Sequence, residues 1–208
     1  MRNQRSGFTM VEVIIAAGIL SLALVSTADL VATTGDTLTV GTSMANLDAK
    51  ANALLAKIER EIVQAGTETL IPGTPIGEPG LTYRLAFGYE EGAVQWGSQT
   101  RIEFRADEAQ DGIDNDSDRF IDEGRVVQVR NPGTAAEAVT DWGGGICAFL
   151  EGEIPNGIDD NGNSLIDERG LCFSLEGQAI VIRLSVEGRD TKGRVMVRTV
   201  STAVRPRN

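Results

Sequence analysis

The sequence predicts an α+β fold in which one long N-terminal helix packs on an antiparallel β-sheet. Apolar residues recur at every third or fourth position through the first third of the chain, which is the period of a helix. From about residue 81 the period changes to two, which is typical of strands with one buried face. Such a sheet needs a cover, and the apolar stripe of the helix supplies one.

The predicted helix begins with an apolar run, residues 8–31, which follows a leader, residues 1–7, that contains two arginines. The run has the length of about 20 residues that a helix needs to span a bilayer. One ionisable residue, Glu12, stands near its start. Because an unpaired carboxylate is costly inside a membrane, an acid at this position indicates a function.

Residues 7–12, with the sequence GFTMVE, resemble the cleavage and methylation motif of type IV prepilins. In that family a dedicated peptidase cuts after the glycine and methylates the new N-terminal residue. The resemblance implies that the chain is cut between Gly7 and Phe8, that Phe8 is methylated, and that Glu12 pairs with the N-terminus of a neighbouring subunit. It also implies a pilin-like fold. Two alternatives stay open, namely a secretory signal peptide cleaved near Ala28 and a plain membrane anchor.

Residues 32–66 are expected to form the amphipathic half of the helix, ending near Gly66. Glycine and β-branched threonine are poor helix formers, so residues 33–42 predict a bend or a frayed turn. The end of this half, residues 53–66, resembles W-type minor pilins and J-type minor pseudopilins, as does the end of the chain, residues 201–208. The predicted apolar stripe consists of Leu47, Ala51, Leu54, Ile58, Ile62 and Ala65.

Residues 67–208 are expected to form a β-rich globular domain that begins with a loop rich in proline and glycine. Trp96 and Trp142 are interpreted as core or interface residues. The glycines that follow Trp142, residues 143–145, are interpreted as part of a flexible linker. Strands are predicted at residues 81–89, 99–105, 125–130, 179–187 and 194–204.

An acidic repeat interrupts this domain, at residues 111–123 and again at residues 156–168. Both copies contain Gly-Ile-Asp and Ile-Asp-Glu, and most other differences exchange Asp for Asn, which keeps a side-chain oxygen. Calcium takes about six to eight oxygen ligands, so the repeat predicts one or two calcium sites that resemble EF-hand-like and thrombospondin-type loops. The predicted ligands of the first copy are Asp111, Asp114, Asp116, Asp118, the Phe120 carbonyl, Asp122 and Glu123. Those of the second copy are Asp159, Asn161, Asn163, the Leu165 carbonyl, Asp167 and Glu168.

The isoleucines of the repeat are expected to point away from the ion and to anchor each loop in the core; they are Ile113, Ile121, Ile158 and Ile166. The alternative is that both copies are solvated turns. Magnesium fits less well, because it retains several waters and favours phosphate-bearing sites. A hydrolase with paired carboxylates is also less favoured, since the acids are local and repetitive.

Cys147 and Cys172 bracket the second repeat. In an exported chain an even number of cysteines favours a disulfide, which would close the loop around this repeat. The alternative is a pair of reduced thiols in the core.

A formal net charge of −11 argues against general nucleic-acid binding. The sequence contains no histidine, which is the commonest general base, and no enzyme is predicted. The sequence predicts a minor pilin or pseudopilin of a type IV pilus or a type II secretion system. We expect a single span in the bacterial inner membrane with the C-terminal domain outside the cytoplasm, followed by assembly into a periplasmic or cell-surface filament. Expected partners are other pilin subunits and prepilin peptidase. The alternative is a membrane-anchored calcium-binding surface protein that does not polymerise.

Overall fold

The computed structural model describes residues 8–207, which form two compact units, one up to Thr42 and one from Ser43 onward. Among these residues lie the helix α1 (Met10–Val63) and the short 3₁₀ helix η1 (Thr67–Thr69). The strands are β1 (Ile76–Glu78), β2 (Gly80–Glu90), β3 (Ala93–Ala106), β4 (Gly124–Arg130), β5 (Ala138–Ile146), β6 (Leu171–Glu176), β7 (Ala179–Arg189) and β8 (Val195–Val204). The predicted α+β class is confirmed.

The first unit is the part of α1 that precedes Ser43, and its side chains are mostly exposed. By length and composition α1 can cross a membrane. The frayed turn expected at residues 33–42 is wrong, because the helix is continuous there. Threonine hydroxyls in this stretch donate to carbonyls three or four residues earlier, so their polar groups are satisfied within the helix. These hydroxyls belong to Thr33, Thr34, Thr37, Thr39 and Thr42, with donor–acceptor distances of 2.8 to 3.0 Å.

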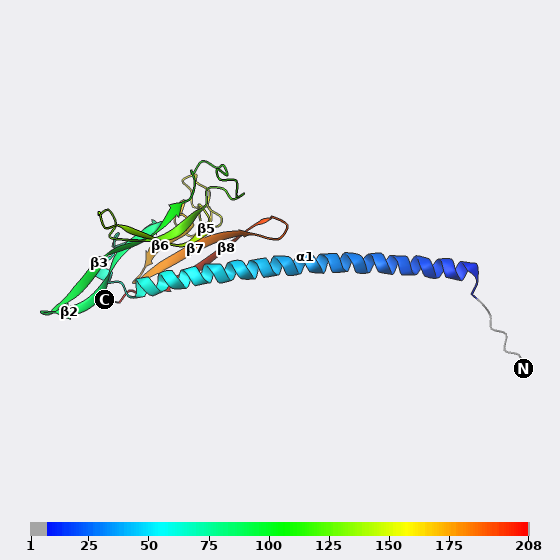
Figure 1. Cartoon of the computed structure of the whole chain (residues 1–208), viewed down its shortest axis with the longest axis horizontal. Helices are drawn as coiled ribbons and strands as arrows, with labels where there is room; N and C mark the ends of the chain where they lie inside the picture. Colours follow the sequence, from blue (N-terminus) through cyan, green and yellow to red (C-terminus); the bar gives the residue numbers. More distant parts are fainter. Residues whose placement is uncertain (1–7, 208) are drawn as a thin grey trace, which may run out of the picture. The chain divides into compact units, whose positions relative to one another are not determined.

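The second unit contains the remainder of α1 and the sheet. All six residues of the predicted stripe are buried, with exposed fractions of 6% or less. They join sheet residues such as Phe173, Ile182 and Val186 in one apolar core. The later part of α1 lies along one face of the sheet, and two long loops project on the other side (Figure 1). The helix therefore covers the sheet as its periodicity predicts.

Strand β7 is the centre of the antiparallel sheet. It pairs with β8 along one edge, from Ile180 to Arg189. Along its other edge it pairs first with β6 and then, at Val186, with Ile146 of β5. Beyond β5 the order continues through β4 and β3 to β2. The loops that precede β4 and β6 therefore both end beside the middle of the sheet.

The flexible linker expected at residues 142–145 is wrong, because these residues belong to β5. The glycines leave room for α1: a Cβ on Gly145 would lie 2.8 Å from Nζ of Lys50, and one on Gly143 would touch Leu54. Trp142 packs against the core, with the ammonium of Lys57 4.4 Å from its ring centroid. The glycine run is thus a strand that a helix crosses closely. Strands β1 and β6 were also not predicted.

Candidate functional site: two acidic loops and the start of the helix

The start of α1 is capped by its own side chains. The Thr9 hydroxyl accepts a hydrogen bond from the Glu12 amide at 3.3 Å, and the Glu12 carboxylate accepts bonds from the Thr9 amide and hydroxyl, both at 2.8 Å. This is the reciprocal arrangement of a capping box. Phe8 is 87% exposed. The predicted cleavage residue, Gly7, and the leader lie outside the described residues.

The first acidic repeat lies in loop 1, residues 107–123, which joins β3 to β4. Its two ends meet where the Asp107 amide donates to the Glu123 carbonyl at 3.1 Å. Inside the loop the Asp122 carboxylate accepts hydrogen bonds from the amides of Asp111 and Gly112 at 2.9 to 3.0 Å. These hydrogen bonds help to close the loop, and the roles of Asp111 and Asp122 as ligands stay predictions.

Five carboxylates converge in loop 1. Oxygen atoms of Glu108, Asp114 and Asp116 lie within 4.8 Å of one another, and so do those of Asp116, Asp118 and Glu123. Because Asp116 belongs to both groups, the five acids form one connected cluster. Four of them were predicted as ligands, and the structure adds Glu108.

Glu123 is the buried member of this cluster. Glu123 is 4% exposed, and its Oε2 atom has no hydrogen-bond partner among residues 8–207. Burial raises the pKa of Glu123 to about 7, and the charges of Asp118 and Glu108 add to the rise. A buried carboxylate without a partner is costly, and a bound cation would remove that cost.

The second repeat lies in loop 2, residues 147–170, and has the same backbone conformation as the first. Four equivalent pairs of residues have positive φ angles in both loops, a conformation that is uncommon outside glycine. The pairs are Gly112 and Gly157 (80° and 79°), Ser117 and Gly162 (67° and 77°), Arg119 and Ser164 (77° and 70°), and Asp122 and Asp167 (57° and 52°). The hydrogen bonds correspond too, since Asp167 accepts from the amides of Asn156 and Gly157. The repeat is therefore one structural unit used twice.

Loop 2 carries fewer charges at the same positions. Asn161 and Asn163 stand where loop 1 has aspartates, and the Asn163 amide nitrogen donates to Oε1 of Glu168 at 2.6 Å. Glu168 is 1% exposed, and within the described part of the chain its Oε2 atom has no hydrogen-bond partner. Asp159, like Asp114, accepts hydrogen bonds from amides three and five residues later. Both loops thus end in a buried glutamate with one unsatisfied oxygen.

Glu108 and its counterpart Glu153 were missed by the sequence analysis. Each carboxylate accepts hydrogen bonds from two backbone amides of its own loop. One of the two is the amide of Asp122 in loop 1 and that of Asp167 in loop 2. Both residues precede the boundary drawn for the repeat by three positions and share the same offset. An alignment of the two copies extended upstream would have found them.

Phe120 and Leu165 were predicted to bind the ion through their backbone carbonyls. The amides of Phe120 and Leu165 donate at 2.8 Å to the side chains of Asp118 and Asn163. The Phe120 ring lies 4.5 Å from the guanidinium of Arg189. Their role as carbonyl ligands stays a prediction.

The expectation that the isoleucines anchor the loops in the core is wrong. Ile113, Ile121, Ile158 and Ile166 are 55% to 61% exposed. The loops turn their acids and many backbone amides inward, toward one another, so the intervening apolar side chains are left outside. What anchors each loop is its buried glutamate.

The two cysteines are free thiols on either side of the second repeat, Cys147 as the first residue of loop 2 and Cys172 in β6. The Cys147 amide donates to the Ser185 carbonyl, and Cys172 pairs with Arg183, so both flank the same stretch of β7. Burial raises the pKa of Cys172 to about 12 and also raises that of Cys147. The disulfide stays a prediction.

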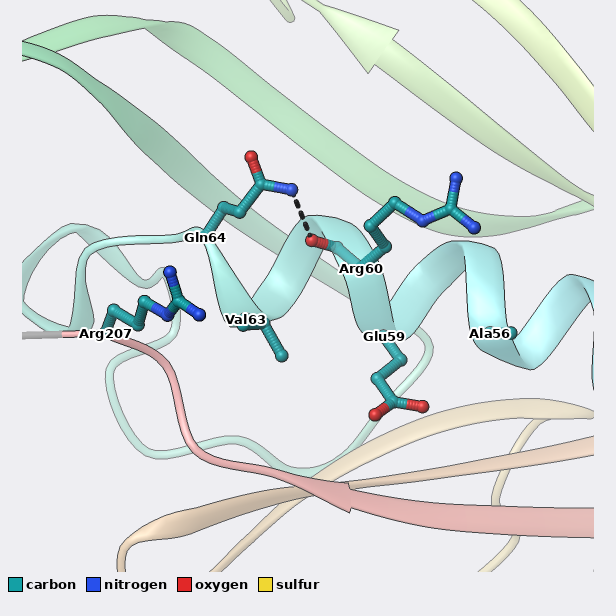
Figure 2. Close-up of a pocket in the computed structure, with 6 residues that line it drawn as sticks. All are labelled: Ala56, Glu59, Arg60, Val63, Gln64 and Arg207. Carbon is teal, nitrogen blue, oxygen red and sulfur yellow. Dashed lines mark hydrogen bonds between the residues drawn. The ribbon is translucent and has the colours of Figure 1, made fainter.

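A separate cavity of about 490 Å³ lies at the end of α1. Its six lining residues include Arg60 and Gln64 on one side of the helix and Glu59 on the other (Figure 2). Arg207 comes from the C-terminal segment, and its backbone amide donates a hydrogen bond to the Val63 carbonyl. These polar groups diverge, so the cavity does not present a converging set of ligands.

Residues 2–28 match the family model of the prokaryotic N-terminal methylation motif. No curated protein and no solved structure matched the chain. The matched segment contains Phe8, Glu12 and the apolar start of α1. The motif implies processing by prepilin peptidase and assembly with other pilins, and the apolar helix supports anchoring in the inner membrane. The motif therefore supports a type IV prepilin-like N-terminal segment, and the chain has a pilin-like α+β fold.

Proposed function

We propose that this chain is a minor pilin or pseudopilin that assembles through its N-terminal helix into a type IV pilus or a type II secretion pseudopilus. The observation that carries the proposal is the methylation motif at residues 2–28, with Glu12 inside an otherwise apolar segment. The resemblance of residues 53–66 and 201–208 to W-type and J-type subunits supports a minor subunit. The function is assembly and not catalysis.

The first prediction concerns processing. The mature protein should begin at methylated Phe8, and Gly7→Val should accumulate the uncut precursor, because a side chain at the cleavage position would crowd the peptidase. Mass spectrometry of the intact protein measures both. Gly18→Val is the matched control, since Gly18 lies in the same apolar segment with no atom near its Cβ position. A mature chain that begins at Met1 would indicate a plain anchor, and one that begins near Asp29 a signal peptide.

We also propose that each acidic loop binds one calcium ion. Carboxylate and amide oxygens are the donors that calcium prefers, and its coordination shell tolerates irregular geometry. Loop 1 offers Glu108, Asp114, Asp116, Asp118 and Glu123. The equivalent positions of loop 2 are Glu153, Asp159, Asn161, Asn163 and Glu168. The unsatisfied buried oxygens of Glu123 and Glu168 support the proposal. They are the groups that gain most from a cation.

The second prediction is that calcium stabilises the folded domain. Binding to the folded state alone contributes about 2.7 kcal/mol when free calcium is about 100 times the dissociation constant. The melting midpoint of the full chain in detergent should therefore rise by several degrees in millimolar calcium relative to chelator, and less in magnesium. Asp116→Ala combined with Asp118→Ala should remove most of the rise.

The matched control for this experiment is Glu90→Ala with Glu91→Ala. These two acids lie exposed at the turn between β2 and β3, so the control changes the net charge equally and leaves the loops intact. It should keep the full calcium effect. Equal midpoints in calcium and in chelator for the unmodified chain would show that the loops are solvated turns.

A further inference from the structure

A third buried glutamate, Glu187, lies outside both loops on β7. The residues on either side of it face α1: Val186 belongs to the core, and Gly188 lies against Leu47 of the helix. Because side chains alternate along a strand, Glu187 points to the opposite face of the sheet. That is the face on which the loops stand (Figure 1).

Loop 1 covers this part of β7. The Phe120 ring of the loop stacks on the guanidinium of Arg189, two residues beyond Glu187. Burial raises the pKa of Glu187 to about 7, and the negative charges of Glu123 and Asp118 are the next largest causes. The strand register agrees with this, because Gly124 of β4 pairs with Ile146 of β5, and Ile146 pairs with Val186 of β7. Glu123 and Glu187 therefore each lie one residue from the same cross-strand row.

Glu187 is 9% exposed, and no described residue donates a hydrogen bond to its Oε1 atom. The same holds for Oε2 of Glu123. The nearby Arg189 side chain does not donate a hydrogen bond to the Glu187 carboxylate, because its Nε and Nη2 atoms have no partner among the described residues. Lys50 of α1, whose Nζ atom lies beside Gly145 of β5, reaches a cavity of about 240 Å³ that Glu187 also lines, but among the described residues the two form no ion pair. Glu187 is thus a second buried carboxylate with an unsatisfied oxygen, in addition to Glu123, and the loop 1 cluster contains four further acids.

We propose that Glu187 supplies a carboxylate oxygen to the cation of loop 1 from outside the repeat. The ion would then join loop 1 to the central strand of the sheet. This inference rests on the proposed calcium binding, and it makes the two sites unequal. In loop 2 the buried glutamate receives a hydrogen bond from Asn163. Loop 1 should bind calcium more tightly, through its extra charges and through Glu187.

The test is calorimetric titration of the metal-stripped full chain in detergent with calcium chloride. Asp159→Ala disables loop 2 and should leave one binding event, that of loop 1. In this background Glu187→Gln should weaken the remaining event at least tenfold, which equals about 1.4 kcal/mol. Glu176→Gln, on the neighbouring strand β6, is the control and should leave it unchanged, because its carboxylate pairs with Arg183.

Melting experiments separate a ligand from a merely structural side chain. Without metal, Glu187→Gln should raise the midpoint or leave it unchanged, because it removes a buried charge that Glu123 repels. In calcium the same variant should melt below the unmodified chain. A midpoint lowered equally in both conditions, or an unchanged calcium affinity, would overturn the role of Glu187 while leaving calcium binding intact. An unmodified chain that binds no calcium would overturn the proposed sites as well.

Discussion

Glycine is required at position 66 because there is no space for a side chain, and not because the backbone conformation there needs glycine. Its φ angle is −77°, which any residue adopts. A Cβ atom at this position would overlap the six-membered ring of Trp96, whose indole nitrogen donates to Glu68 at 3.1 Å. The helix was expected to end near Gly66, and α1 ends three residues earlier, at Val63. The glycine instead lets β3 approach the segment that leaves the helix.

At this residue scale, Gly66→Ala should destabilise the folded domain by about 1 to 3 kcal/mol, the usual cost of overpacking. Chemical denaturation measures the loss. Gly73→Ala is the control, since its Cβ would meet nothing nearer than 3.8 Å, and it should be close to neutral. A Gly66→Ala variant as stable as the unmodified chain would mean that the Trp96 ring moves aside without cost.

At the element scale, the two acidic loops are joined to each other as well as to the sheet. The Arg169 side chain, directly after the buried Glu168, donates to the Gln110 side chain of loop 1. Gln110 in turn donates to the Asp122 carbonyl at 2.6 Å. The Arg169 guanidinium also lies 4.5 Å from the Phe149 ring of loop 2. The loops therefore form one polar layer over β7, on the face opposite α1.

At the scale of the whole molecule, the assembly role of Glu12 can be separated from its role in the helix. Glu12 caps the start of α1, and glutamine can do the same in a capping box. Glutamine carries no charge, however, so it cannot form an ion pair with the N-terminus of another subunit. Both Glu12→Ala and Glu12→Gln should thus be cut normally and fail to enter the filament.

Incorporation is measured by the amount of each variant in purified filaments relative to the membrane fraction. Thr9→Ala is the matched control, because it removes the capping hydroxyl and keeps the charge. It should assemble better than either Glu12 variant. Normal incorporation of Glu12→Gln would show that the cap matters and that the charge pair does not.

The sequence by itself determined the features that depend on local period and repetition. The helix stripe from Leu47 to Ala65 is buried as predicted, because a helix places every third or fourth residue on one face. The strand after Ala179 and its return to Val204 follow from alternation and a turn. The convergence of Asp114, Asp116 and Asp118 follows from their spacing within one loop.

Only the tertiary structure decided the features that depend on contacts between distant parts of the chain. Residues 142–145 form part of a strand that α1 crosses closely, and a run of glycines does not indicate which element will pack against it. The isoleucines lie outside because the loops stand on the sheet through their buried glutamates. Glu187 and Glu123 lie near one cross-strand row because β4, β5 and β7 bring residues more than sixty positions apart together. Such proximity arises from packing, and no local pattern in the sequence encodes it.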